Sequence, residues 1–357
     1  MTTDPTLEIA LLRLAAQRVV GPPASDPAAT VEHLLALQAQ DLPGAVASIA
    51  LRTAGRSTAQ VRAAFDAGAV VRTWPMRGTL HAVAAVDAVW MGELMTARPR
   101  VAAARRQAQL GLDDDALRVG GTTARAALAA ADPGLTRAEL LAVWRAAGLP
   151  TDAGRGYHLI VHLAHAGVLC QGPFRGAEQL FVLVERWVPA PRRLDREHAL
   201  AELTLRYLRG HGPATVPDLA RWSGLPLGEV RTGLALVADR LDTLEVAGAT
   251  YHLDPGTPAL LAAHRDAAMA THLLPGFDEM VLGYADRTAT VPAAYADRVV
   301  PGGNGVFRPT VLRGGRAVGT WRVVGRGGAR RVELEAFDGA PSAELLADVT
   351  RLAAAPG

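Results

Sequence analysis

The chain has 357 residues, of which 50% are hydrophobic and 20% are charged. This composition excludes the disordered and fibrous classes, and the length predicts two to four modules with their own cores. The formal net charge of +2 gives no overall basic footprint of a nucleic-acid binder. No stretch approaches about 18 uninterrupted apolar residues, so we expect a cytoplasmic protein with no membrane partner.

The first module predicted from the sequence spans residues 1–132. Helical spacing of apolar residues is expected at 6–19, 28–38, 44–53 and 58–67. The segment VVRTWPMRGTLHAV then has β-branched ends around a central Trp-Pro-Met, which predicts a hairpin. Its tip and flanks carry Arg72, Arg77, Thr79 and His81.

Two further modules share one order of elements. In residues 133–195, a Thr136-x-x-Glu139 cap precedes LLAVWRAAG, a second helix is expected in YHLIVHLAHAG, and VLCQGPFRGAEQLFVLV predicts strand, turn, strand. Residues 196–256 repeat the plan with helix-turn-helix spacing and two short strands around Ala247-Gly248. Here Thr215 and Asp218 resemble a capping box, Gly224 is expected to end one helix and Pro226 to open the next. Recurrence of this order, with little sequence identity, indicates tandem modules.

The last module, residues 257–357, is predicted to consist of strand pieces separated by Gly-Gly pairs, as in a meander or small barrel. The segment 298–332 holds eight arginines and no acidic residue. Folded onto one face, it would carry a strong positive potential. The alternative is an ordinary solvated surface of strands and turns.

The sequence lacks the residue patterns of several common kinds of active site. His158, His162 and His165 share a predicted helix face, but no carboxylate, Cys-x-x-Cys or HExxH accompanies them, so we expect no metal. The hydrolase G-x-S-x-G, a dinucleotide fingerprint and a Walker lysine are also missing, and we expect no cofactor. The pair Asp278-Glu279 could serve sugar chemistry or could lie in a surface turn.

Gln38 and Gln40 bracket one alanine where a predicted helix is about to end. Two neutral amides would suit the holding of a water molecule. Residues i and i+2 lie about 200° apart around a helix but on one side of an extended segment, so the amides converge only if the backbone leaves helical geometry. Pro43 favours this because it disfavours helix at Leu42. The alternative is a pair of polar residues at a helix end.

Four blocks, in order, resemble the AlkZ/YcaQ-like family of tandem winged-helix DNA glycosylases: HLLALQAQDLPGAVASIALR, RTWPMRGTLHAV, LLPGFDEMVLGYADR and NGVFRPTVLRGGRAVGTWR. Gln38-Ala39-Gln40 is similar to the glutamine form of the family motif, which marks the AlkZ branch. The resemblance implies an α+β fold, with three winged-helix units around a concave DNA-sized cleft and a β-rich, barrel-like C-terminal domain.

The resemblance also implies a function. The expected reaction is monofunctional excision of N7-alkylguanine, including bulky or crosslinked adducts, from double-stranded DNA, as in self-resistance to a genotoxin. Gln38 and Gln40 are the expected catalytic residues. The candidates for DNA binding, at the backbone or the rim of the site, are Arg52, Arg72, Arg77, Thr79 and His81, and the alternative for each is a structural role. We expect a monomer in the cytoplasm, associated with the nucleoid.

Two alternatives remain open at this point. A non-enzymatic winged-helix protein, either a transcription regulator or an adduct-sequestering binder, would also use the helix-turn-helix element. A glycosylase descendant that has lost turnover is the other, because Ala39 is smaller than many hydrophobic residues and would set the two amides less firmly.

Overall fold

The computed structural model describes residues 4–325 and 331–354. The chain divides into two compact units. The split unit joins Met1–Ala59 with Leu200–Gly357, and the central unit is Gln60–Ala199. The finer division into four domains stays a prediction.

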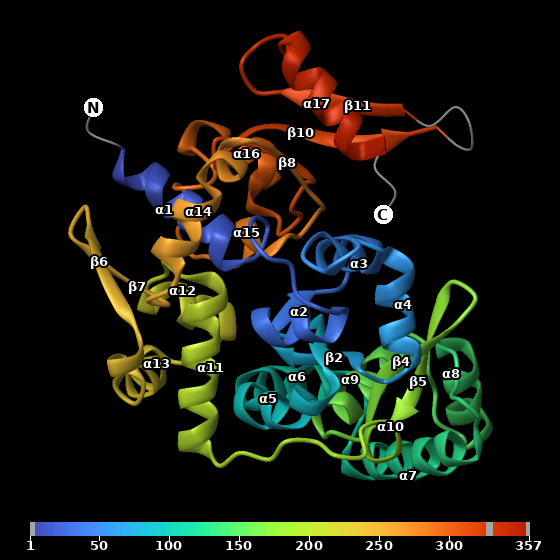
Figure 1. The fold of residues 1–357 in the computed structure, drawn as a ribbon. Coiled ribbons are helices and arrows are strands. Elements are labelled where there is room, and N and C mark those ends of the chain that lie inside the picture. Colours follow the sequence, from blue (N-terminus) through green and yellow to red (C-terminus); the bar gives the residue numbers. More distant parts are fainter. Residues whose placement is uncertain (1–3, 326–330, 355–357) are drawn as a thin grey trace. The chain divides into compact units, whose positions relative to one another are not determined.

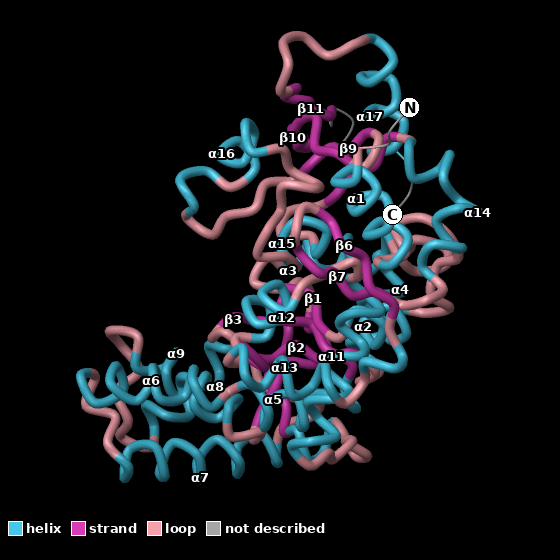
Figure 2. Tube along the Cα trace, turned by 90° about the vertical axis from the view of Figure 1, so that its left-hand side faces the viewer, coloured by secondary structure: helices cyan, strands magenta, loops and turns pink. Residues whose placement is uncertain are grey.

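The central unit contains an antiparallel sheet in the order β3-β2-β4-β5. The helices α7 and α8 pack against β5 (Figure 1), while α5 and α9 pack against β2 (Figure 2). Buried Trp74, Trp144, Leu159 and Phe181 belong to its core. The elements are α4 (Thr58–Asp66), β2 (Val70–Met76), β3 (Thr79–Ala84), α5 (Ala88–Met95), α6 (Ala97–Gln109), α7 (Asp114–Ala130), α8 (Arg137–Ala146), α9 (Arg155–His165), β4 (Leu169–Arg175), β5 (Glu178–Leu183) and α10 (Val184–Trp187).

The split unit draws its core from both ends of the chain. Leu11, Leu14 and Val19 pack in one cluster with Leu274, Met280 and Leu312, and α1 lies along α14 (Figure 1). Its helices are α1 (Pro5–Ala16), α2 (Pro27–Leu34), α3 (Leu42–Leu51), α11 (Arg196–His211), α12 (Val216–Ser223), α13 (Leu227–Ala235), α14 (Thr257–Met269), α15 (Glu279–Leu282), α16 (Ala296–Val299) and α17 (Ala343–Ala354).

The strands of the split unit are mostly antiparallel neighbours along the chain. A sheet in the order β11-β10-β9-β8 forms a meander, and β6 and β7 form a separate hairpin. Their bounds are β1 (Ala36–Gln38), β6 (Asp242–Val246), β7 (Ala249–Leu253), β8 (Thr271–Leu274), β9 (Thr310–Arg313), β10 (Arg316–Val324) and β11 (Arg331–Ala336). The predicted meander is thus confirmed.

The predicted helix starts are confirmed in detail. Thr136 and Glu139 form both halves of a capping box at α8, and Thr215 and Asp218 do the same at α12. Gly224 ends α12 in the left-handed conformation, with φ of 75°, which a residue with a Cβ adopts with strain. Both predicted orders of helix, helix, strand and strand are present in residues 133–195 and 196–256.

Three expectations are corrected. The helix predicted over residues 28–38 ends at Leu34, because Leu35 takes φ of 65° and the chain continues as β1. Residues 257–269, predicted to be strand-rich, form α14. The arginines of residues 298–332 do not make an unopposed positive surface, since carboxylates elsewhere pair with most of those described: Arg298 with Glu335, Arg313 with Glu344, Arg316 with Asp4, and Arg322 and Arg331 with Glu333. Arg326 and Arg330 lie outside the described residues.

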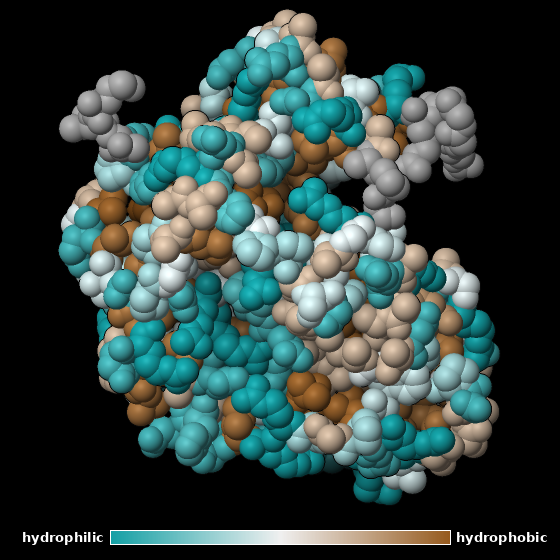
Figure 3. Space-filling model, viewed as in Figure 1, coloured by the Kyte–Doolittle hydropathy of each residue, from teal (hydrophilic) through white to brown (hydrophobic). Residues whose placement is uncertain are grey.

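Hydrophilic residues cover much of the face seen in Figure 1, and hydrophobic residues appear among them in small groups (Figure 3). Isolated exposed apolar side chains are normal on a folded protein. Within the described ranges, no helix is both long and apolar enough to cross a bilayer.

Candidate active site

Gln38 and Gln40 face each other at the end of β1. Gln38 Nε2 donates to Gln40 Oε1 over 3.1 Å, and the backbone N–H of Gln40 donates to Gln38 Oε1 over 3.3 Å. The Gln38 side chain is 5% exposed, Gln40 is exposed and Ala39 between them is buried. The extended backbone of β1 ends at Gln38, and the two carboxamides meet on one side of the chain.

These contacts fix which end of each amide carries the oxygen. A backbone N–H can only donate, so the Gln38 atom opposite it must be the carbonyl oxygen. The amino group of Gln38 then faces Gln40, whose facing atom must likewise be oxygen. Each oxygen accepts one hydrogen bond here and retains a second lone pair. The pair is therefore an uncharged acceptor group.

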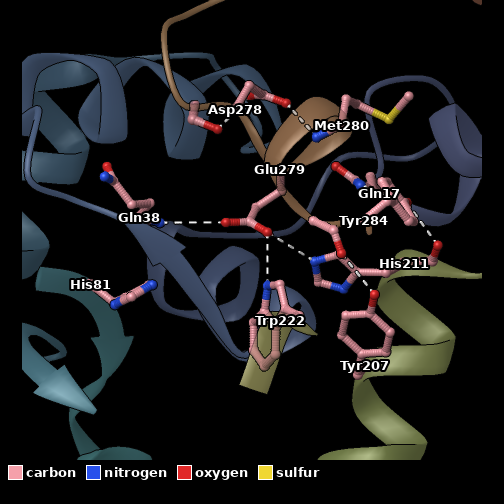
Figure 4. A network of polar contacts seen from close by, with 12 residues as sticks. Gln17, Gln38, His81, Tyr207, His211, Trp222, Asp278, Glu279, Met280 and Tyr284 are labelled. Carbon is pink, nitrogen blue, oxygen red and sulfur yellow. Dashed lines mark hydrogen bonds and ion pairs between the residues drawn. The ribbon is translucent and has the colours of Figure 1, made fainter. Parts of the chain in front are cut away.

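A buried carboxylate lies directly behind Gln38. Glu279, the first residue of α15, is fully buried, and its Oε1 accepts from the backbone N–H of Gln38 over 3.4 Å (Figure 4). Its Oε2 accepts from Trp222 Nε1 over 2.9 Å and from His211 Nε2 over 3.3 Å. Because a carboxylate only accepts, His211 carries a proton on Nε2.

A ring of aromatic side chains holds His211. Its imidazole stacks on Tyr207 with ring centroids 4.5 Å apart, and the Tyr284 hydroxyl donates to the His211 carbonyl over 2.7 Å. Gln17 Nε2 donates to the Tyr284 hydroxyl over 2.9 Å. Burial raises the pKa of Tyr284, so the phenol keeps its proton as a donor. Segments from both ends of the chain thus set the position of one imidazole.

Arg52, predicted to contact DNA, instead lies in the core of the split unit. Its guanidinium is 0% exposed and donates to both oxygens of Asp278 over 2.8 Å, to Ser48 and to Gln17. Burial alone would raise the pKa of Asp278, but Arg52 and Ser48 hold that pKa below its ordinary value. Buried residues of the split unit bind the guanidinium, so it is not available to a phosphate. Asp278 and Glu279 are themselves buried, so neither lies in a surface turn.

The other predicted DNA-binding residues lie on the β2–β3 hairpin of the central unit. Arg72 Nη1 donates to Gln171 Oε1 over 3.1 Å, and burial lowers its pKa to about 10. Arg77 forms the turn with φ of 54° and donates to His81 Nε2 over 3.2 Å. The described residues offer no hydrogen-bond partner to the buried hydroxyl of Thr79.

His81 supports the hairpin from inside. The side chain is fully buried, and its Nδ1 donates to the Thr79 carbonyl over 2.9 Å because Nε2 must accept from Arg77. Burial, with Arg77 nearby, lowers the pKa of His81 to about 3, so the imidazole is neutral. A buried neutral ring makes no direct phosphate contact, and its predicted role in DNA contact changes to support of Arg77.

No sequence signal pointed to His211 or Trp222, and the roles of Asp278 and Glu279 stayed open. Residue 279 is 68 positions from His211 and 241 positions from Gln38. No helical or strand periodicity connects residues so far apart. Among the described residues, no group of three histidine, cysteine, aspartate or glutamate side chains is placed to hold a metal ion.

The comparisons with known proteins agree with one another. A family model described as DNA glycosylase AlkZ-like matches residues 31–355. The chain is 28% identical over 330 residues to a curated Streptomyces sahachiroi protein named interstrand DNA cross-link repair glycosylase, covering 86% of this chain and 85% of that relative. The structure of the present chain is similar to that of Streptomyces sahachiroi DNA glycosylase AlkZ, with a TM-score of 0.79 and 23% sequence identity. The match covers 99% of this chain and 97% of the AlkZ chain.

The structural likeness shows the mixed α and β fold, and the family model adds the enzyme class because it spans most of the chain. The resemblance inferred from the sequence blocks is thereby confirmed. This chain belongs to the AlkZ-like family of DNA glycosylases.

Proposed function

We propose that this enzyme hydrolyses the N-glycosidic bond of N7-alkylguanine in duplex DNA, with Gln38 and Gln40 positioning the attacking water. The observation that carries the proposal is the facing pair of amides, whose oxygens each keep a lone pair. Two such oxygens can accept both hydrogens of one water molecule and leave its own lone pair directed at a carbon atom.

The chemistry suits an uncharged pair of side chains. Alkylation at N7 makes the base cationic, so the base departs without protonation by an acid. As the bond lengthens, the sugar becomes oxocarbenium-like and a water on the opposite face attacks C1′. The electron pair of the broken bond leaves with the base, which becomes neutral, and the attacking water releases one proton to solvent. Neutral amides hold that water but add little basicity, so the reaction requires an activated base. Neutral lesions such as uracil should not be excised.

The substrate class extends to bulky or crosslinked adducts. This extension is supported by the Streptomyces sahachiroi relative, which is named for interstrand cross-link repair. A bulky adduct does not enter a snug pocket easily, so the enzyme should leave it in an open groove instead of enclosing a flipped base.

DNA contact is assigned to the β2–β3 hairpin, through Arg72 and Arg77, whereas the hydroxyl of Thr79 is buried and does not reach a phosphate. All 37 basic residues of the chain are arginine, whose guanidinium fork suits phosphate oxygens. The enzyme should act as a monomer, with affinity that falls steeply with salt. Arg77→Ala should weaken binding to damaged and undamaged duplexes alike and reduce the salt slope by about 1, whereas unchanged binding would remove the hairpin from the interface.

The deciding experiment is excision from duplex DNA carrying N7-methylguanine. Gln38→Ala and Gln40→Ala should each lower the single-turnover rate by about 100-fold, the scale of one lost transition-state hydrogen bond. The matched control is Gln109→Ala, an exposed glutamine on α6 of the central unit, which should excise at the wild-type rate.

Three outcomes contradict the proposal. Rapid excision of uracil would show that no activated base is needed. Retained excision in both glutamine variants would remove the amides from the mechanism. Binding of the damaged duplex without any excision by the wild type would identify an adduct-sequestering protein in place of an enzyme.

A further inference from the structure

Glu279 is an unusual buried carboxylate. It is 0% exposed, and among the described residues no arginine forms an ion pair with it. Its three neighbours are the indole N–H of Trp222, the imidazole of His211 and the backbone N–H of Gln38. Burying a carboxylate costs several kcal/mol unless its oxygens are well satisfied. The fold thus keeps an unfavourable group at one place, directly behind the proposed catalytic glutamine.

We propose that Glu279 is a positioning residue that fixes the end of β1, and with it the carboxamides of Gln38 and Gln40. This inference rests on the proposed function of those two glutamines. Glu279 does not touch the water or the sugar. It acts through the backbone N–H of Gln38, which Figure 4 shows directed at the carboxylate while the Gln38 side chain extends the other way.

The three contacts differ in length, and the difference matters. Trp222 Nε1 lies 2.9 Å from Oε2 and anchors the carboxylate, while Gln38 N lies 3.4 Å from Oε1, at the long end of hydrogen bonding. A small displacement of the carboxylate therefore breaks the contact to Gln38 first. Loss of that contact removes the hydrogen bond that holds the last residue of β1, which carries one of the two amides.

At position 279, only a carboxylate can accept a hydrogen bond on each of its two outer atoms. Trp222 Nε1 and the Gln38 backbone N–H can only donate, and they face different oxygens of Glu279. A glutamine at position 279 would have the same shape, but its amino group would meet one of these two donors in either orientation. The side chain would satisfy the indole or the strand, and not both.

The test is Glu279→Gln, with single-turnover excision of N7-methylguanine at saturating enzyme and with duplex affinity measured separately. The rate should fall by about 10-fold to 100-fold, the usual cost of losing a supporting group behind an active residue. The dissociation constant should stay within about twofold, because no contact to DNA is removed.

A second substitution should rescue the first. Trp222→Phe removes the indole donor, so a glutamine at 279 can turn its amino group toward the ring and His211 while its oxygen accepts from Gln38. His211 then accepts on Nε2 and carries its proton on Nδ1, a tautomer open to a neutral imidazole. In the Trp222→Phe background, Glu279→Gln should cost less than about threefold. Such coupling between neighbouring groups is what a double-mutant cycle detects.

A readout independent of catalysis is hydrogen exchange at the Gln38 amide. Glu279→Gln should accelerate that exchange by at least about 10-fold, because the protecting acceptor is displaced. The matched control is Val349→Ala, which opens a cavity in the buried cluster of Val311, Leu345 and Val349 and destabilises the split unit elsewhere. It should leave both the excision rate and the exchange of Gln38 unchanged.

The outcomes separate this inference from the proposed function. If Gln38→Ala loses excision while Glu279→Gln excises and exchanges like the wild type, the positioning role is wrong and the proposed function stands. A loss from Glu279→Gln that is equally large with and without Trp222→Phe also overturns the positioning role. If the wild type excises nothing, the proposed function fails, and unaltered exchange at Gln38 in Glu279→Gln would then refute the structural link as well.

Discussion

The surroundings of Asp278 and Glu279 differ, although the two residues are adjacent and both are buried. Asp278 accepts two hydrogen bonds from Arg52 at 2.8 Å and one from Ser48 at 2.6 Å, so its charge is matched by a guanidinium. Glu279 meets an indole, an imidazole and a strand end, with no guanidinium among the described residues. The first carboxylate joins α3 to the segment before α15, and the second supports the proposed catalytic strand.

The difference shows that two adjacent carboxylates have separate roles. The carboxylate of a bidentate ion pair has its charge and its hydrogen bonds matched by one partner within the core. A carboxylate surrounded by single donors depends on each of them, and each of them depends on it. Variants of Asp278 should therefore change stability, whereas variants of Glu279 should change the geometry of Gln38.

The largest expected effect tests the first half of this comparison. Asp278→Asn leaves the Arg52 guanidinium buried without its charge partner, which should lower the free energy of unfolding by about 3–5 kcal/mol. Urea denaturation followed by circular dichroism measures it. Asp115→Asn is the matched control, because Asp115 pairs with Arg118 on an exposed helix surface. A midpoint for Asp278→Asn equal to that of the control would show that the ion pair contributes nothing.

Gly283→Ala tests the second half. A Cβ at this position would lie 2.6 Å from the Glu279 carbonyl oxygen and 2.9 Å from Cδ2 of His211. Overpacking there should lower the free energy of unfolding by about 1–3 kcal/mol and slow excision, since it moves the groups that hold Gln38. In Gly228→Ala, where nothing lies within 4 Å of the new Cβ, both quantities should be unchanged or slightly improved. Wild-type excision by Gly283→Ala would separate His211 from the site.

The buried neutral histidines, unlike the two buried carboxylates, should make the protein less stable in mild acid. Burial lowers the pKa of His81 to about 3 and that of His33 to about 4, against 6.5 when unfolded. Between pH 6.5 and 4 the unfolded chain binds protons that the folded chain does not. Stability should therefore fall as pH falls, by up to about 1.4 kcal/mol per pH unit for each residue. His81→Gln should have a shallower dependence, and an unchanged slope would mean that His81 is protonated in the fold.

The smallest effect is expected at the surface of the sheet formed by β8 to β11. Arg322 donates to Glu333 over 2.7 Å, but the Arg322 side chain is 74% exposed, so water and salt screen the pair. Arg322→Ala should leave the unfolding midpoint and the excision rate unchanged in the same assays. A marked loss of stability or of excision would show that this exposed ion pair contributes as the buried carboxylates do.

The sequence predicted elements whose causes are local. The caps at Thr136 and Thr215 satisfy N–H groups within three residues, and the turn at Ala247-Gly248 needs only its own backbone. The facing of Gln38 and Gln40 was predicted on condition that the helix ended early, and the positive φ of Leu35 meets that condition. The expected cause, Pro43, is wrong, because Leu42 and Pro43 begin the helix α3. Leu35 is buried, and no local pattern indicates its positive φ.

Distant contacts explain what could not be predicted. Arg52 was a candidate for DNA contact because it lies in one of the blocks that resemble the family, but its partner Asp278 is 226 positions away. Likewise, the donors that surround Glu279 come from α11, α12 and β1, so its role is visible only once those elements are packed. The helix α14 was missed because the Gly-Gly pairs that follow it dominated the expectation for the whole module.

The split unit has a consequence for synthesis on the ribosome. Both glutamines emerge early, yet the carboxylate behind them is translated 241 residues later, after the entire central unit. A nascent chain therefore carries the proposed water-holding amides for most of its translation without the group that secures them. On the proposed mechanism, full activity requires the C-terminal part of the split unit to pack on its N-terminal part, so an incomplete chain should excise bases slowly.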